Sequence, residues 1–454
     1  MAVIYKDYAN IKKGTTDLQR LYAGNTLIWE LESPTPTGYS NQYLTFVAIT
    51  SGDVYYSGST TANTISYSTD SGRTWSTPAR IVTVSLNSGD TIMWKGNMTP
   101  ITSLGIGCFD SNQLRRPAYY DAQGNIMSLL YGDNFSGQTI LNDDYSFFNL
   151  FKGGSSSVIY GIRSAENLVL PATSLTQYCY WRMFELCANF IKAPSILPAT
   201  TLATQCYREM FHNCPSLTTA PQLPATTLAI GCYQAMFQGC TSLTTAPELP
   251  AMTAVGDCYF HMFYGCTSLT TAPQLPATTL GETCYTRMFL GCTNLTTAPS
   301  VLPATELTSS CYEGMFNGCT SLTTAPVISA ITAMTESCHN MFADCASLVN
   351  VSDLNILYFG SNRSCESMFS GCTSLTTAPL LPATTLTQGC YRAMFSGCTS
   401  LNYIKMLATN ISASSCLTNW VYGVAASGTF VKDANATIPS GVDGIPNGWS
   451  VQNE

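Results

Sequence analysis

Cysteines recur along this chain at an almost constant interval. Successive pairs begin 25 to 27 residues apart, and the second member of each pair follows seven or eight residues after the first. The first members are Cys179, Cys206, Cys232, Cys258, Cys284, Cys311, Cys338, Cys365 and Cys390, with Cys416 alone after them. A fixed period between about 20 and 50 residues is the signature of a solenoid, a propeller or another repeat array. The period therefore constrains the architecture of more than half of the chain.

A single unit shows what each repeat contains. The apolar spacing in Cys232–Phe237 predicts about one and a half turns of helix. Gly239 is expected to end that turn, because glycine tolerates the left-handed conformation. The segment Leu-Thr-Thr-Ala at 243–246 predicts a short strand that Pro247 closes. None of these pieces can bury a core alone, so the coils are expected to stack and share one.

Stacking would turn every repeated position into a column with a spacing of about 4.8 Å. We expect a spine of offset-stacked phenylalanine rings, flanked by buried methionines and a leucine column. Its members are Phe184, Phe211, Phe237, Phe263, Phe289, Phe316, Phe342, Phe369 and Phe395. Because every coil repeats these residues, they predict a core rather than a cofactor site, which would occur once.

The unit Cys-Tyr-x-x-Met-Phe-x-Gly-Cys-Thr-Ser-Leu-Thr-Thr-Ala-Pro-x-Leu-Pro resembles the BspA-like (Treponema-type) leucine-rich repeat. The resemblance covers about residues 145–420 and implies a leucine-rich-repeat solenoid of about ten coils. The segment 150–154, Leu-Phe-Lys-Gly-Gly, matches as a first repeat without its cysteine. The units at Cys338 and Cys365 depart from the pattern, since His339 and Glu366 stand where tyrosine is expected and each pair is one residue shorter. A local bend or a change of register is expected there.

The front of the chain has a different pattern. Alternating apolar and polar residues at 43–49, 81–86 and 91–94, separated by turn residues, predict an antiparallel β-sandwich. Before it, the segment 21–29 predicts a hairpin that turns at Gly24-Asn25. The predicted fold class is therefore mixed β/α. We expect a β-hairpin attachment module at 1–32, a β-sandwich-like domain at 33–142, the solenoid at 143–420 and a C-terminal cap at 421–454.

Both ends carry further resemblances. The hairpin segment Tyr-Ala-Gly-Asn-Thr-Leu-Ile-Trp, from Tyr22 to Trp29, resembles the opening of phage virion proteins, which implies that these two aromatic residues serve attachment. The closing segment Gly-Thr-Phe-Val at 428–431, followed by Gly-Ile-Pro-Asn-Gly-Trp-Ser-Val at 444–451, resembles a tail shared by repeat proteins of gut anaerobes and their phages. The first residues show no secretory signal, so assembly in a host cytoplasm is expected rather than export.

Composition excludes several classes of protein. The chain has 454 residues with 19 basic and 27 acidic residues, a net charge of −8, and no cluster of lysine or arginine, which argues against nucleic-acid binding. It has no apolar run of about 18 residues, so no membrane insertion is expected. No Ser-His-Asp set, carboxylate pair or phosphate loop stands out, and His212, His261 and His339 form no column. We therefore expect no enzyme, no catalytic residue, no cofactor and no metal.

Two local features have alternative interpretations. The segment 68–75, Ser-Thr-Asp-Ser-Gly-Arg-Thr-Trp, matches the Asp-box of sialidases, but it occurs once and favours a turn that Asp70 caps. The cysteine pairs could form disulfides, bind zinc or remain buried thiols. The column geometry suits a disulfide dihedral poorly and the spacing does not match a zinc finger, so buried thiols are favoured.

Threonine pairs give the repeats a candidate binding surface. Their first members are Thr218, Thr244, Thr270, Thr296, Thr323 and Thr376. Hydroxyl groups on a stacked face can bind a glycan or a protein, or can simply form a cross-strand ladder that stabilises the sheet. The residues just ahead of the cysteines, which differ from coil to coil, are alternative contacts: Tyr178, Gln205, Gly231, Asp257 and Thr283.

These observations favour one function and leave two alternatives. The favoured one is a non-enzymatic bacteriophage virion structural protein, as a fibre, an appendage or a capsid decoration. It would attach to other virion proteins through its N-terminal region, form a homo-oligomer, and present its repeats to a host glycan, a host protein or a virion protein. A bacterial cell-surface or secreted adhesin is the alternative. A carbohydrate-active enzyme, which only the Asp-box supports, is the third.

Overall fold

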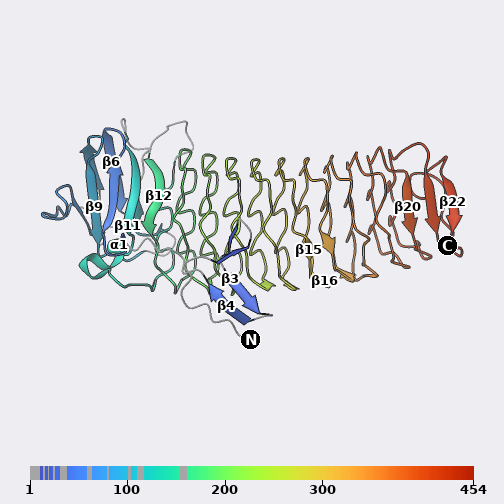
Figure 1. The fold of residues 1–454 in the computed structure, drawn as a ribbon, viewed down its shortest axis with the longest axis horizontal. Helices are drawn as coiled ribbons and strands as arrows, with labels where there is room; N and C mark the ends of the chain where they lie inside the picture. The colour runs from blue at the N-terminus through green and yellow to red at the C-terminus, as the bar shows by residue number, and fades with distance from the viewer. Residues whose placement is uncertain are drawn as a thin grey trace.

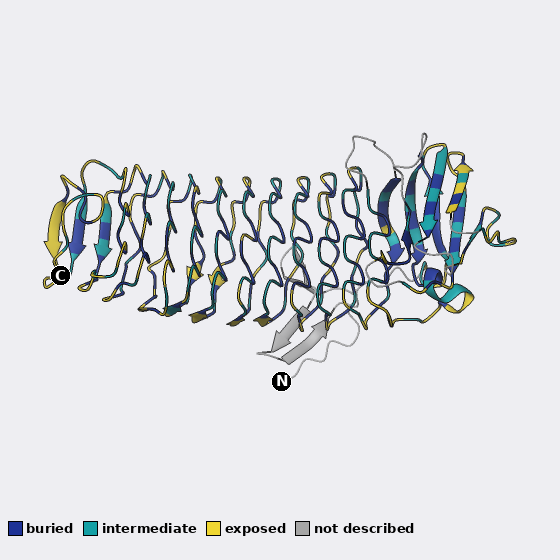
Figure 2. Ribbon diagram, turned by 180° about the vertical axis from the view of Figure 1, so that it is seen from behind, coloured by how far each residue is buried: buried dark blue, intermediate teal, exposed yellow. Residues whose placement is uncertain are grey.

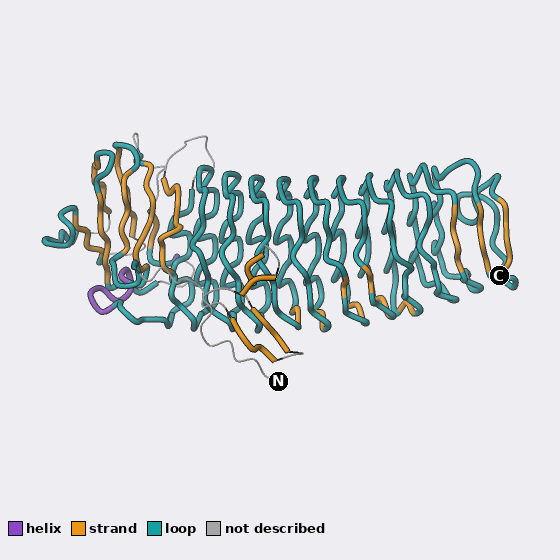
Figure 3. The backbone as a smooth tube through the Cα atoms, viewed as in Figure 1, coloured by secondary structure: helices purple, strands orange, loops and turns teal. Residues whose placement is uncertain are grey.

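The chain forms a long stack of coils with two β-sheets at the end where the coils begin (Figure 1). The structure is a computed structural model that describes residues 38–58, 64–78, 81–100, 104–109, 117–153 and 161–454, and four earlier strands by their backbone alone. Turns and short strands make up nearly all of the described chain (Figure 3). Helix is confined there to α1 (Ser128–Tyr131) and the 3-10 turn η2 (Gly132–Asn134).

Two sheets form the front of the molecule, and their strands include the three runs predicted from the sequence. A five-stranded sheet contains, in order, β12 (Gly161–Val169), β11 (Tyr119–Asn125), β5 (Leu44–Ala48), β9 (Thr91–Gly96) and β7 (Ile65–Ser68). A three-stranded sheet contains β10 (Gly107–Cys108), β6 (Gly52–Gly58) and β8 (Ile81–Leu86). Pairing is antiparallel except between β11 and β12, a parallel pair that the alternating pattern does not predict.

An aromatic core joins these sheets to the stack. Phe46 of β5 and Tyr56 of β6 contact Phe109, with ring centroids 4.7 and 5.0 Å apart. Phe109 stacks on Phe151 at 5.6 Å, and Phe151 stacks in turn on Phe184 of the first complete repeat at 5.3 Å. The repeat without a cysteine therefore starts the phenylalanine column, as the sequence predicted. One hydrophobic core runs through both parts of the chain.

The N-terminal strands are described only by their backbone. Strand β1 (Ile11–Lys13) pairs with β2 (Thr16–Leu18), and β3 (Arg20–Ala23) pairs with β4 (Thr26–Glu30), both antiparallel. Tyr22 lies in β3 and Trp29 in β4, but their side chains and the turn at Gly24-Asn25 lie outside the described residues. The attachment role of these two residues remains a prediction.

The helical turn expected in each coil does not form, and consecutive tight turns replace it. Every fourth residue has a positive φ, for example Gly231 at 60°, Ala235 at 52° and Gly239 at 74°. An α-helix cannot pass through such residues, because the left-handed conformation reverses the path of the backbone. Gly239 does take the left-handed conformation that the sequence predicted. The apolar spacing alone cannot distinguish this chain of turns from a short helix, since both bury the same residues.

Backbone hydrogen bonds explain how these turns join the coils. The amide of Met236 donates within its own coil to the carbonyl of Tyr233 at 3.1 Å. The amides of Ala235 and Phe237 donate to carbonyls of the next coil, on Phe260 at 2.8 Å and on Met262 at 2.9 Å. Amides thus alternate between closing a turn and bonding to the neighbouring coil. This pattern satisfies the buried backbone and holds adjacent coils in register.

The predicted columns are confirmed. Neighbouring phenylalanine rings from Phe184 to Phe395 stack nearly parallel, with centroids 5.3 to 5.7 Å apart and interplanar angles of 1 to 10°. These rings, the methionine before each and the leucine column are buried. Figure 2 shows that buried residues recur in every coil of the stack. Tyrosines form a second stacked column from Tyr180 to Tyr312, which ends where the repeats depart from the pattern.

The two shorter cysteine pairs keep the regular stack and change only which residue fills each column. The amide of Tyr312 donates to Ser337, whereas the amide of Tyr285 donates to Cys311. Ser337 therefore occupies the cysteine column, and Cys338 occupies the tyrosine column. Cys365 does the same one coil later. Of the two expected departures, the change of register is the one that occurs, and Phe316 and Phe342 still stack at 5.5 Å.

Replacing Ser337 with cysteine is expected to stabilise the stack. Its hydroxyl is fully buried without a hydrogen-bond partner in the described structure, and an unsatisfied buried hydroxyl costs about 1–3 kcal/mol. We expect Ser337→Cys to raise the free energy of unfolding by about 1 kcal/mol in urea titrations. Ser364→Cys is the control, because its hydroxyl already has carbonyl partners at 3.3 and 3.4 Å. An equal gain in both variants would contradict the explanation.

Short parallel strands run along the coils. They are β13 (Thr253–Ala254), β14 (Thr279–Leu280), β15 (Val301–Leu302), β16 (Glu306–Leu307), β17 (Val327–Ile328), β18 (Thr332–Ala333) and β19 (Tyr358–Phe359). The last coils carry β20 (Tyr403–Met406), β21 (Thr429–Lys432) and β22 (Ser450–Asn453), which pair in parallel. Trp420 follows Phe395 in the ring column, and its Nε1 donates to the carbonyl of Gly444 at 2.8 Å. None of the described helices could cross a bilayer.

Candidate functional site

The six predicted threonines are all exposed on the stack. The second members of their pairs form single parallel bridges, such as Thr245 with Thr271 and Thr271 with Thr297, rather than the short strands expected from the sequence. The row is not continuous, because Val349 takes the position between Thr323 and Thr376 and is 44% exposed. We refer to the six residues as the threonine ladder.

Part of the threonine ladder is bonded within the stack itself. The hydroxyl of Thr296 donates to the carbonyl of Thr270 at 3.1 Å, and that of Thr218 donates to the carbonyl of Ile191 at 3.0 Å. At the four other positions the described structure gives the hydroxyl no such bond: Thr244, Thr270, Thr323 and Thr376. The ladder therefore has hydroxyl groups that reinforce the stack and others that can bond to a ligand.

The threonine ladder continues the five-stranded sheet. Ser164 of β12 forms a parallel bridge with Lys192, and Lys192 forms the next one with Thr219. The same surface thus extends from the front sheet onto the coils. This continuity could not be predicted from the sequence, because β12 lies beyond the predicted boundary at 142 and yet pairs with β11 before it. The domain boundaries themselves remain predictions.

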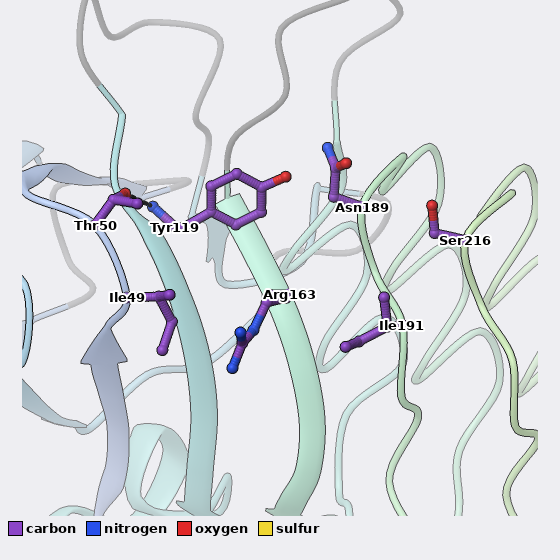
Figure 4. Close-up of a pocket in the computed structure, with 7 residues that line it drawn as sticks. All are labelled: Ile49, Thr50, Tyr119, Arg163, Asn189, Ile191 and Ser216. Atoms are coloured by element: carbon purple, nitrogen blue, oxygen red, sulfur yellow. Dashed lines mark hydrogen bonds between the residues drawn. The ribbon is translucent and has the colours of Figure 1, made fainter.

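A pocket of about 360 Å³ lies where the front sheet meets the first coils, and we call it the ladder-head pocket (Figure 4). Its lining residues are Ile49, Thr50, Tyr119, Arg163, Asn189, Ile191 and Ser216. The Tyr119 ring extends toward Asn189, and the Ile191 side chain points toward Arg163. Sequence reasoning missed this site, since its members come from separate segments between positions 49 and 216 and share no motif.

Arg163 is held in place by an ion pair. Its Nε donates to Asp121 Oδ1 at 2.9 Å and its Nη2 donates to Oδ2 at 2.6 Å. The carboxylate raises the pKa of Arg163, which stays charged. Thr50 is also fixed, because its hydroxyl accepts a hydrogen bond from the Tyr119 amide at 3.0 Å. Besides Arg163 and Thr50, the lining offers hydrogen-bonding groups on Tyr119, Asn189 and Ser216.

A cluster of charged residues lies on the first coils, on the side of the stack that the consecutive tight turns form. We call this side the turn side. Single ligand atoms of Glu185, Glu209 and His212 lie within 4.8 Å of one another, a spacing that could hold a metal ion. However, Lys152 contacts Glu185 at 2.7 Å, and Arg208 contacts Glu209 at 3.0 Å. Burial raises the pKa of Glu185, but hydrogen bonds from His212 and Lys152 outweigh it and lower the pKa. Because cations already neutralise both carboxylates, we interpret the cluster as an ion-pair network.

The remaining sequence candidates have structural roles. Asp70 accepts hydrogen bonds from the Thr74 amide and hydroxyl at 2.9 and 2.6 Å, which lower the pKa of its carboxyl and cap the turn as predicted. Trp75 of the same segment packs under Lys95 at 4.2 Å. The five alternative contacts ahead of the cysteines all have positive φ: Tyr178, Gln205, Gly231, Asp257 and Thr283. They define the turns and are not part of the ladder.

The three histidines occupy different positions on the turn side. His212 bonds to Glu185 at 3.2 Å. His261 stacks on Phe260 at 3.9 Å, and burial lowers its pKa to about 4. His339 does not occupy the tyrosine column, because Cys338 fills it. The Nε2 of His339 lies 3.1 Å from the Asn340 side-chain amide nitrogen. No two of them share a cluster in the described structure.

Comparisons with known proteins agree with the repeats. The family model described as "BspA type Leucine rich repeat region (6 copies)" matches at residues 156–296, 204–349 and 305–419. A leucine-rich repeat protein from Bacteroides ovatus is similar at 15% identity, with a TM-score of 0.31, over 72% of this chain and 87% of that one. A leucine rich cell surface protein from Faecalibacterium prausnitzii is similar at 13% identity and a TM-score of 0.25, over 74% and 91%. The search of curated proteins gave no match.

Proposed function

We propose that this chain, which belongs to the BspA type leucine-rich repeat family, is a non-enzymatic structural protein of a bacteriophage virion. As a fibre, an appendage or a capsid decoration, it displays the threonine ladder for binding to a host surface or to another virion protein. The exposed ladder, which continues the front sheet, supports a role in display. Neither the matching family nor the two similar structures is described as an enzyme.

The thiols are the observation that carries the virion proposal. The 19 cysteines from Cys179 to Cys416 are buried thiols that form no disulfide. The second cysteine of each pair donates its Sγ hydrogen to a phenylalanine carbonyl at 2.9 to 3.1 Å. A core built from thiols suits folding in a reducing cytoplasm, where a virion assembles. An exported adhesin would fold beyond that compartment, where unpaired cysteines are exposed to oxidation.

The two ends of the molecule would then have separate tasks. The N-terminal region, with Tyr22 and Trp29, attaches the chain to other virion proteins and supports a homo-oligomer. The stack, whose core is continuous with that of the front sheets, holds the ladder away from the particle as a rigid arm. A repeat array with one shared core resists bending, because each coil packs against both neighbours.

Locating the protein tests this proposal. Phage particles purified from an infected culture, and washed host cells from the same culture, would be analysed by mass spectrometry and by gold-labelled antibody. We expect the chain at a fixed stoichiometry on particles, and we expect the purified full-length protein to compete with phage adsorption. Finding it on uninfected cells and never on particles would contradict the proposal and favour the bacterial adhesin.

A further inference from the structure

We propose that the ladder-head pocket binds one neutral pyranose residue of a surface glycan, and that the threonine ladder contacts the residues that follow it. This inference rests on the proposed role in surface binding and names the chemical class of the ligand. It concerns the described residues at the junction of β11, β12 and the first two coils.

The residues that line the pocket provide both an apolar surface and hydrogen-bonding groups, the two kinds of contact that a sugar ring makes. A pyranose ring has apolar C–H faces and hydroxyl groups around its edge. The half-buried Tyr119 ring, with Ile49 and Ile191, provides an apolar surface on which such a face can pack. Asn189 and Ser216 lie across the pocket from the Tyr119 ring (Figure 4), and their amide and hydroxyl groups can bond to the hydroxyl edge. Pockets that bind small molecules combine an apolar lining with a few polar groups in this way.

The charges favour a neutral ligand. Asp121 balances the guanidinium of Arg163 through two hydrogen bonds, so the pair carries no net charge. The pair is also partly open to solvent, since the Arg163 side chain is 39% exposed and the Asp121 side chain 29% exposed. A fixed, planar pair with donors on one side and acceptors on the other can bond to neighbouring hydroxyl groups. An anionic ligand would compete with Asp121 for the same cation.

The position of the pocket favours an oligosaccharide rather than a monosaccharide as the ligand. Ser216, on the pocket wall, is two residues from Thr218, the first member of the ladder. The Ile191 carbonyl, beside the pocket, accepts the hydrogen bond of the Thr218 hydroxyl at 3.0 Å. A glycan whose end occupies the pocket would therefore reach Thr244 and Thr270, whose hydroxyl groups have no bond within the stack among the described residues. Longer oligomers should bind more tightly than a single residue.

Titration calorimetry with the full-length protein tests the inference. The probes are the methyl glycosides of glucose, galactose, mannose and N-acetylglucosamine, and linear oligomers of each sugar with two to six residues. For the probe that binds best, we expect Tyr119→Ala to weaken affinity at least tenfold and Asn189→Ala severalfold. Tyr119→Phe keeps the ring and should stay within about threefold of the wild type. Tyr264→Ala, a half-buried tyrosine on the turn side, is the matched control and should not change affinity.

Two results would overturn the inference. One is the absence of saturable binding to any probe, and the other is equal affinity of the Tyr119→Ala and Tyr264→Ala variants for a probe that does bind. Circular dichroism of each variant separates a folding defect from a lost contact. If Tyr119→Ala is misfolded, the affinity of Asn189→Ala still tests whether the pocket binds the sugar. Either result leaves the virion proposal standing, because that proposal is decided by where the protein is found.

Discussion

Raising the pH from 8 to 10.5 is expected to unfold the stack, although such alkali leaves many proteins folded. The buried thiols are the reason. Burial raises the pKa of eight of them from 9.0 to about 12: Cys179, Cys232, Cys240, Cys284, Cys292, Cys345, Cys390 and Cys398. The unfolded chain releases these protons near pH 9, whereas the folded chain retains them. The stabilisation is therefore complete below pH 9 and is lost as the pH rises toward 12.

The size of the effect follows from the number of thiols. At pH 10 each of the eight favours the unfolded chain by roughly 1 kcal/mol, so together they remove on the order of 10 kcal/mol. This is comparable to the whole stability of a typical domain, about 5–15 kcal/mol. Burial also raises the pKa of further thiols in both cysteine columns, such as Cys258 and Cys266, which adds to the loss.

Circular dichroism between pH 7.5 and 11, with a reducing agent present, measures this transition. We expect a steep loss of signal between pH 9 and 10.5 that is reversed on return to pH 7.5. The native thiols should also react far more slowly with iodoacetamide at pH 8 than the urea-unfolded thiols, because the thiolate is the reactive form. A structure that persists at pH 11 would contradict the assignment of buried, protonated thiols.

Removing one ring from the middle of the phenylalanine spine is expected to break the stack at that point. Phe263 is fully buried and stacks on Phe237 and Phe289, with both centroid distances at 5.5 Å. Phe263→Ala removes both contacts and leaves a cavity, which costs about 3–5 kcal/mol. Because each coil is stabilised mainly by its two neighbours, the loss should divide the array into two separately unfolding segments.

Urea titration and limited proteolysis together measure this effect. We expect a lower midpoint that splits into two transitions, and new cleavage sites mapped by mass spectrometry to the coil around residue 263. Thr270→Ala is the matched control, since Thr270 is exposed in the same repeat and should change stability by no more than about 0.5 kcal/mol. A single transition with the midpoint of the control would mean that the spine is not the main source of cohesion.

The stack could be predicted from the sequence because its cause is repeated. Each Met-Phe pair and each Gly-Cys corner recurs at a fixed interval, and only stacked coils can bury all of these side chains together. The exposed threonines could be predicted for the same reason. The local backbone could not, because the apolar spacing around Cys232 is compatible with a helix and with a chain of tight turns. The choice between them is made by hydrogen bonds to the next coil, such as that from Ala235 to Phe260.

The candidate pocket illustrates the opposite case. Nothing in the neighbourhood of Tyr119, Arg163 or Asn189 marks these residues as a group, and they meet only because β12 joins the front sheet and the coils follow it. Likewise, the spacing at Cys338 suggests a missing residue, whereas the structure places Ser337 in the cysteine column. The sequence by itself determined which side chains must be buried, since burial of apolar surface depends on composition and period. Only the tertiary structure decided which segments became neighbours, because contacts between distant residues form through backbone pairing that leaves no local pattern.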